Sequence, residues 1–132
     1  MPKWGKFGNV VICEHVVASS GNKHTLIGTY SGDILVAVIP ARIPIAFYIE
    51  YTPTEGNLTK PIEIHVKLNG KKIAGLVAEY DPSSDSKEGL IILPNMAITL
   101  DKPSVFELTA SVEGEKPTLL VKKRITEGDT RA

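Results

Sequence analysis

Cysteine is almost absent from this chain. Cys13 is the only one among 132 residues, so no disulfide can form within the molecule. Small secreted domains often rely on disulfides because their cores are small. The first residues also lack the long apolar core and the small-residue cleavage site of a secretory signal. We therefore expect an intracellular, cytoplasmic protein.

Long hydrophobic runs and an excess of one charge are absent as well. The longest apolar run, residues 34–39, is far too short to cross a bilayer. Fifteen Lys and Arg residues balance fifteen Asp and Glu residues. A chain without net charge has no general attraction to nucleic acid or to an anionic membrane surface. We therefore expect neither a nucleic-acid partner nor a membrane partner.

A helical repeat is the third missing feature, because no long stretch keeps its apolar residues at a spacing of about 3.6. Short β-branched or alternating segments are instead separated by turn-forming residues, which is typical of strands. We predict one all-β domain over residues 1–132, a two-sheet antiparallel sandwich of about seven to nine strands with little or no helix. Residues 1–8 are predicted to form an irregular arm, and residues 126–132 a frayed tail.

The clearest predicted element is a hairpin around Asn69 and Gly70. This dipeptide is the strongest short hairpin signal, because a type I′ turn needs positive φ at both central residues. A two-residue loop pairs Val66 with Ile73 and leaves His65 on the wet face. The buried face in this register is formed by Ile62, Ile64, Val66, Ile73 and Val77.

The segment Cys13-Glu14-His15 offers one candidate for chemistry. In a strand, Cys13 and His15 point to the same face, where a thiol and an imidazole can act as nucleophile and base. Val11 and Val17 share that face, which favours simple packing, and no third orienting group accompanies the pair. We therefore assign no catalytic residue.

The sequence also contains candidate metal ligands. None of the three histidines, His15, His24 and His65, lies at a recognised ligand spacing from another. The loop that contains Asp81 and Asp85 is rich in oxygen ligands but lacks the alternating pattern of a calcium hand. We expect no metal and no cofactor. The binding candidates that the sequence offers are Cys13, His15, His24, Asp81 and Asp85.

Two parts of the chain carry a family resemblance. Residues 11–14 are an apolar segment ending in Cys-Glu, and residues 22–30 continue with a segment that contains Leu26-Ile27-Gly28 and ends at Tyr30. Residues 103–125 contain a Phe-Glu-Leu strand, an acidic glycine turn and a short return strand. These features resemble a family of small uncharacterised bacterial and phage proteins. The resemblance implies an immunoglobulin-like sandwich, and it implies no known activity and no functional residue.

The expected function follows from the fold class. Sandwiches present loops and exposed edges, which suit protein partners, so we expect a non-enzymatic binding or structural module. The first alternative is a small enzyme or ligand-binding protein that uses Cys13, His15 and His24. The second alternative is a carbohydrate-binding sandwich with stacking platforms among Tyr30, Tyr48, Tyr51 and Tyr80.

The first predicted strand, residues 10–17, also suggests self-association. It is apolar on both faces, and such a strand must be covered on both. One sheet-to-sheet core covers one face. The other face requires the N-terminal arm with Trp4 and Phe7, or a second copy of the protein. We therefore expect a homodimer with the arm or the first strand in its interface.

Overall fold

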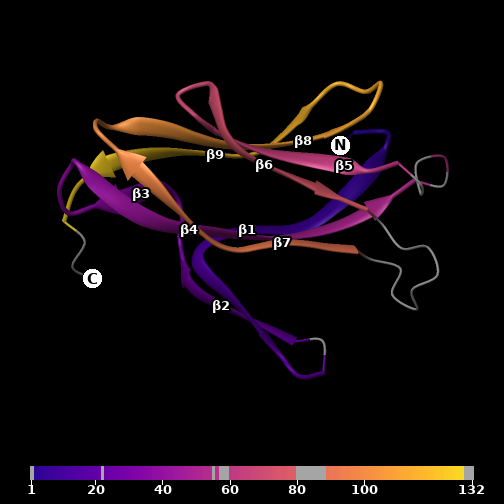
Figure 1. The fold of residues 1–132 in the computed structure, drawn as a ribbon, viewed down its shortest axis with the longest axis horizontal. Helices are drawn as coiled ribbons and strands as arrows, with labels where there is room; N and C mark the ends of the chain where they lie inside the picture. Colours follow the sequence, from indigo (N-terminus) through magenta and orange to yellow (C-terminus); the bar gives the residue numbers. More distant parts are fainter. Residues whose placement is uncertain (1, 22, 55, 57–59, 80–88, 130–132) are drawn as a thin grey trace.

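The computed structural model describes residues 2–21, 23–54, 56, 60–79 and 89–129, and it has nine strands in two sheets. No α-helix occurs among the described residues. Sheet A has the strand order β2-β1-β4-β7, and sheet B has the order β3-β9-β8-β5-β6. Figure 1 shows sheet B above and the curled sheet A below. The all-β, two-sheet architecture is therefore confirmed.

The bounds of the strands fix the two layers. Sheet A contains β1 (Gly5–Ser19), β2 (Lys23–Thr29), β4 (Ala41–Pro53) and β7 (Gly89–Leu100). Sheet B contains β3 (Ile34–Val36), β5 (Ile62–Leu68), β6 (Lys71–Ala78), β8 (Ser104–Val112) and β9 (Thr118–Glu127). All paired neighbours are antiparallel except β3 and β9, which are parallel. Our prediction of purely antiparallel pairing is therefore wrong for this short strand, β3.

The core lies between the sheets because alternate residues of the central strands point inward. Phe47 on β4 and Phe106 on β8 are among the largest fully buried side chains. One continuous cluster of buried apolar residues joins both sheets. Burial of each large side chain of this kind contributes about 1.5–3 kcal/mol. The cluster therefore holds the two layers together.

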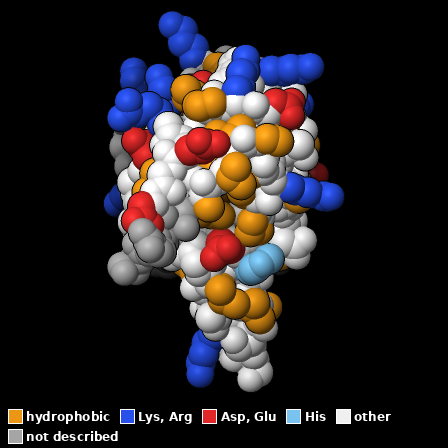
Figure 2. All heavy atoms as spheres, turned by 90° about the vertical axis from the view of Figure 1, so that its left-hand side faces the viewer, with side chains coloured by type: hydrophobic (Ala, Val, Ile, Leu, Met, Phe, Trp, Pro, Cys, Tyr) orange, Lys and Arg blue, Asp and Glu red, His pale blue; other side chains and the backbone are white. Residues whose placement is uncertain are grey.

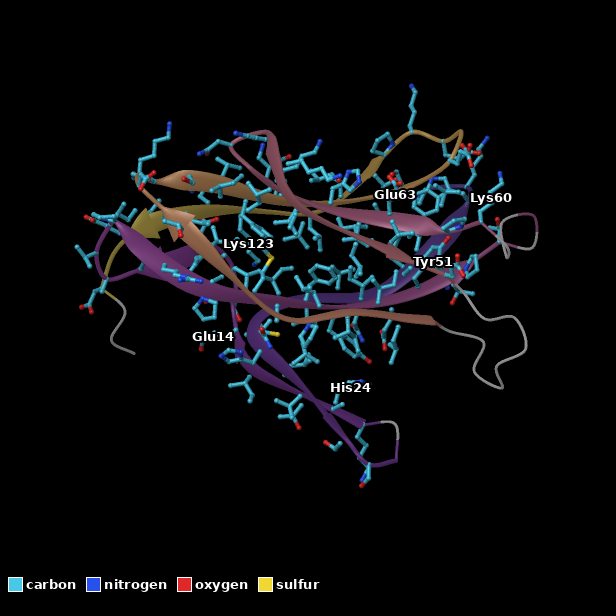
Figure 3. All side chains as sticks on the ribbon, viewed as in Figure 1. Glu14, His24, Tyr51, Lys60, Glu63 and Lys123 are labelled. Atoms are coloured by element: carbon cyan, nitrogen blue, oxygen red, sulfur yellow. The ribbon has the colours of Figure 1, made fainter. Side chains whose placement is uncertain are left out.

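The predicted N-terminal arm is part of this core. β1 begins at Gly5, inside the segment expected to be irregular. Trp4 and Phe7 are buried, with ring centroids 5.9 Å and 5.0 Å from that of Tyr51 on β4. Figure 3 shows Tyr51 between the two sheets. These aromatic residues therefore cannot cover the outer face of β1, because they are packed on its inner side.

The outer face of β1 is covered by its own hairpin. Cys13 pairs with Ala46 of β4, so both side chains lie on the side of sheet A that faces away from sheet B. There they form a second buried cluster with Val16, against which Leu26 of β2 packs. Figure 1 shows the β1–β2 hairpin leaving the sheet and projecting below it. A second copy is therefore not needed to cover this part of the strand, which removes the reason for our predicted β1 interface.

The β5–β6 hairpin has the predicted turn but not the predicted register. Asn69 and Gly70 have φ angles of 53° and 79°, as a type I′ turn requires. Beyond the turn, a bulge at Ile73 makes Val66 pair with Ala74. Since one extra residue moves every following side chain to the other face, Ile73 and Val77 are exposed, and their predicted burial is wrong.

The prediction holds for the buried residues of β5, whereas His65, which we expected to be exposed, is partly buried. Ile62, Ile64 and Val66 of β5 are buried, as expected. The residues of β6 that face the core are Ala74, Leu76 and Ala78. The His65 side chain lies on the outer face with 26% of its surface exposed, and its Nε2 atom is 3.3 Å from a carboxylate oxygen of Glu63.

Two further expectations concern the ends and the membrane. β9 runs to Glu127, two residues into the predicted tail, and residues 130–132 lie outside the described residues. The described part of the chain contains no helix that is long and apolar enough to span a membrane.

Candidate functional site

Cys13 is enclosed and its thiol is held in the protonated form. The residue is fully buried. Burial raises the pKa of the Cys13 thiol, and the neighbouring Glu14 carboxylate raises it further. The sulfur donates a hydrogen bond to the backbone oxygen of His15 at 3.4 Å, not to the imidazole. Since the thiolate is the reactive form, this environment opposes nucleophilic chemistry.

His15 and His24 are not brought together by the hairpin. His15 pairs with Ile27, and His24 pairs with Ala18, three positions further along β1. An odd separation puts the two side chains on opposite faces of the hairpin. The imidazole of His24 instead lies beside Tyr48, with ring centroids 5.8 Å apart. Figure 3 shows His24 on the part of the hairpin below sheet A.

Among the described residues, no group of three or more His, Cys, Asp or Glu side chains has the geometry to hold a metal ion. Asp81 and Asp85 lie outside the described residues.

Three of the four tyrosines proposed as stacking platforms contribute to packing. Tyr51 is buried in the core. Tyr30 is partly buried, and its hydroxyl donates a hydrogen bond of 2.8 Å to the backbone oxygen of Pro44. Tyr48 is also partly buried and packs against the Cys13 cluster. Tyr80 lies outside the described residues. A sugar-stacking platform needs an exposed ring face, which these three described tyrosines do not offer in full.

An open flank between the two sheets is the feature with the clearest binding potential. β6 ends sheet B and β7 ends sheet A, so each has one edge without a neighbouring strand in the described structure. Between these edges lies an apolar crevice of about 100 Å³. It reaches the core and is lined by Phe47, Ile64, Val66, Ala74, Gly75, Leu76, Leu93 and Met96.

The free edges of β6 and β7 differ in how well they are protected against pairing with another strand. β7 carries Pro94 in its interior, and proline cannot donate a ladder hydrogen bond. On β6, Lys71 and Lys72 and the bulge at Ile73 guard only the end near the turn. Residues 74–78 have no charge and no proline. This stretch therefore offers its unpaired backbone groups beside the crevice.

The charges along β6 are separated. Lys71 and Lys72 lie at the end near the turn, and Glu79 follows the other end of the strand. All three residues are exposed. An extended segment that binds along this edge therefore meets positive charge at one end and negative charge at the other.

Exposed apolar residues also lie on and just after β3, including Leu35 and Val38. Figure 2 shows hydrophobic side chains spread over the end of the molecule that is on the left in Figure 1. The nearby hollow of about 250 Å³ includes Lys123, whose amine donates a hydrogen bond of 2.6 Å to the backbone oxygen of Gly32. Because that amine already has a protein partner, this hollow is a weaker candidate than the β6–β7 flank.

Sequence reasoning missed the flank for a specific reason. Our predicted register put Ile73 and Val77 of β6 on the buried face, whereas Ala74 and Leu76 line the crevice. The available signal was Gly75, since an isolated glycine within a strand indicates a bulge or a close backbone approach.

Comparison with protein-family models and with curated proteins gave no match to this chain. The resemblance to small bacterial and phage proteins therefore stays a prediction, and the functional argument rests on the geometry.

Proposed function

We propose that this protein is a non-enzymatic binding module that accepts an extended protein segment along the free edge of β6. The observation that carries the proposal is the unguarded stretch 74–78 beside an apolar crevice. The strand edge supplies backbone donors and acceptors, and the crevice supplies room for apolar side chains. This combination is the basis of recognition by strand addition.

The proposal includes an immunoglobulin-like strand order. In that arrangement, strands A, B and E are neighbours in one sheet, and C, F and G in the other. β1, β4 and β7 correspond to A, B and E, and β5, β8 and β9 correspond to C, F and G. β6 then corresponds to the extra strand that variable-type domains carry beside C. A partner strand that binds along β6 would therefore extend sheet B at the edge where variable-type domains carry additional strands.

Short synthetic peptides test the binding function. One set alternates apolar and polar residues, and a second set has the same composition in shuffled order. We expect the alternating peptides to bind and to shift the backbone amide resonances of residues 73–78. Met96→Gln puts a polar group into the crevice and should weaken binding roughly tenfold, which corresponds to about 1.4 kcal/mol.

The matched control is Ile27→Gln on β2, the other free edge of sheet A, where the side chain is exposed. This variant should bind the peptides as the unmodified protein does. Equal binding of both peptide sets, or resonance shifts confined to β2 and β3, would contradict the proposal.

The rival function, an enzyme that uses Cys13 as its nucleophile, predicts the opposite thiol behaviour. We expect Ellman's reagent to label Cys13 in folded protein far more slowly than in urea-unfolded protein, because the thiol is buried and its pKa is raised. Rapid labelling of the folded protein near neutral pH would favour the enzyme.

A further inference from the structure

We infer that the segment bound along β6 is β6 of a second copy, paired antiparallel about a two-fold axis at Gly75. This inference rests on the proposed function, since it names the partner for the same strand edge. A two-fold contact uses the same surface on both copies, so β6 must be complementary to itself when its direction is reversed. The first two observations below meet that condition, and the third compares β6 with the other described edges.

The first observation is the fit of the side chains. With Gly75 opposite Gly75 of the partner, Ala74 lies opposite the partner's Leu76, and Ile73 lies opposite the partner's Val77. Ala74 and Leu76 line the crevice, so their pairing continues the apolar layer across the contact. Ile73 and Val77 are 41% and 60% exposed in a single copy. The paired copies therefore cover these two exposed side chains with each other.

The second observation is the fit of the charges. In this register the end of β6 that carries Lys71 and Lys72 lies beside Glu79 of the partner, and the symmetry repeats the contact at the other end. A parallel arrangement would instead put the lysines of both copies side by side. The charge pattern therefore favours the antiparallel, centred register.

The third observation is that the other described edges are poorer templates. β7 has Pro94 in its interior, and β3 has only three residues. β2 contains Gly28 with a φ angle of 65°, which interrupts an extended edge. β6 is thus the longest edge without an internal proline or a left-handed residue. A two-fold pairing also uses both β6 edges at once, so the assembly closes as a dimer.

Charge reversal tests the inference. Sedimentation of the full chain over a wide concentration range should show a monomer–dimer equilibrium. Glu79→Lys sets like charges at both ends of the contact, and we expect the dissociation constant to rise about tenfold or more. The double variant Lys71→Glu with Lys72→Glu should have the same effect. Combining all three substitutions should restore the dimer, because the charges are then exchanged.

A cysteine cross-link tests the register. Gly75→Cys puts one thiol at the two-fold axis on the outer face, with only the ends of the flexible Lys72 and His65 side chains nearby. Mild oxidation should give a disulfide-linked dimer at a low protein concentration. Thr25→Cys on β2 is the matched control, because it lies on an edge that we do not place in the contact. Thermal melts of each variant confirm that it is folded.

Two outcomes would overturn the inference. A dimer whose stability is unchanged by Glu79→Lys uses another surface. A chain that stays monomeric at high micromolar concentration has no such contact. If the monomer still binds alternating peptides along β6, the proposed binding function stands and only the choice of partner is wrong. If the protein stays monomeric and also fails to bind the alternating peptides, both proposals fail.

Discussion

The two long hairpins of this protein differ in how their apolar side chains are covered. The β1–β2 hairpin curls over its own sheet, and Val16 and Leu26 cover Cys13. The β5–β6 hairpin stays in sheet B, where β6 ends the sheet beside an open apolar crevice. Both β2 and β6 are free edges of their sheets, but the β1–β2 hairpin packs apolar side chains onto sheet A, whereas β6 lies beside an open apolar crevice. The comparison teaches that an edge strand can cover apolar residues of its own chain or leave them open to a partner.

Local backbone geometry explains the difference. In β2, Gly28 has a positive φ and lies against the Glu14 side chain, which allows close approach of the strands where the hairpin departs. In β6, the bulge at Ile73 reverses the faces of the strand without removing it from the sheet. The irregularity at Gly28 therefore lies where two strands approach closely, and the bulge at Ile73 changes which side chains of β6 are exposed.

The largest predicted effect separates the two possible registers of the β5–β6 hairpin. Val66→Asp buries an unpaired charge in the core and should lower the free energy of unfolding by about 4 kcal/mol or more. Ile73→Asp should change it by less than about 1 kcal/mol, because Ile73 is exposed after the bulge. Urea denaturation at low protein concentration measures both. Equal losses of unfolding free energy in the two variants would support the register without the bulge.

The second prediction concerns the closed hairpin. Gly28→Ala should lower the free energy of unfolding by about 1–2 kcal/mol for the left-handed backbone alone. A further loss should arise because the new methyl group must displace the Glu14 side chain. Gly32→Ala is the matched control, since its φ is also positive but no atom lies near the added methyl group. If both variants lose the same stability, the contact with Glu14 carries no cost.

The third prediction concerns the pH dependence of the free energy of unfolding at Tyr30, the residue directly after β2. Burial and the nearby Glu14 charge raise the pKa of Tyr30 from 10 to about 12. Between pH 10 and pH 12 the unfolded tyrosine ionises while the folded one keeps its proton, so the folded state binds more protons. Stability should therefore fall as pH rises through this window.

Tyr30→Phe tests this assignment by denaturation at several pH values. The variant should lose about 1 kcal/mol near neutral pH, because it lacks the hydrogen bond to Pro44. Its stability should also depend less steeply on pH above 10. An unchanged slope would show that Tyr30 ionises freely in the folded protein.

The smallest predicted effect lies on the outer face of sheet B. His65→Ser should change the free energy of unfolding by less than about 0.5 kcal/mol, because its contact with Glu63 is partly exposed. Thermal melting can detect a larger change. A loss of more than about 1 kcal/mol would show that this face is covered, as it would be by a partner.

The local patterns of the sequence determined the strands and one turn. Alternation along β5 and β8 and the Asn69-Gly70 pair are local signals, because the period of two and positive φ act within a few residues. The all-β class follows from such signals repeated along the chain. The tertiary structure decided which residues face which neighbour. The bulge at Ile73, the burial of Trp4 against Tyr51 and the cover over Cys13 depend on contacts between distant segments. The crevice at β6 arises in the same way, because it exists only where the edges of two separately paired sheets meet.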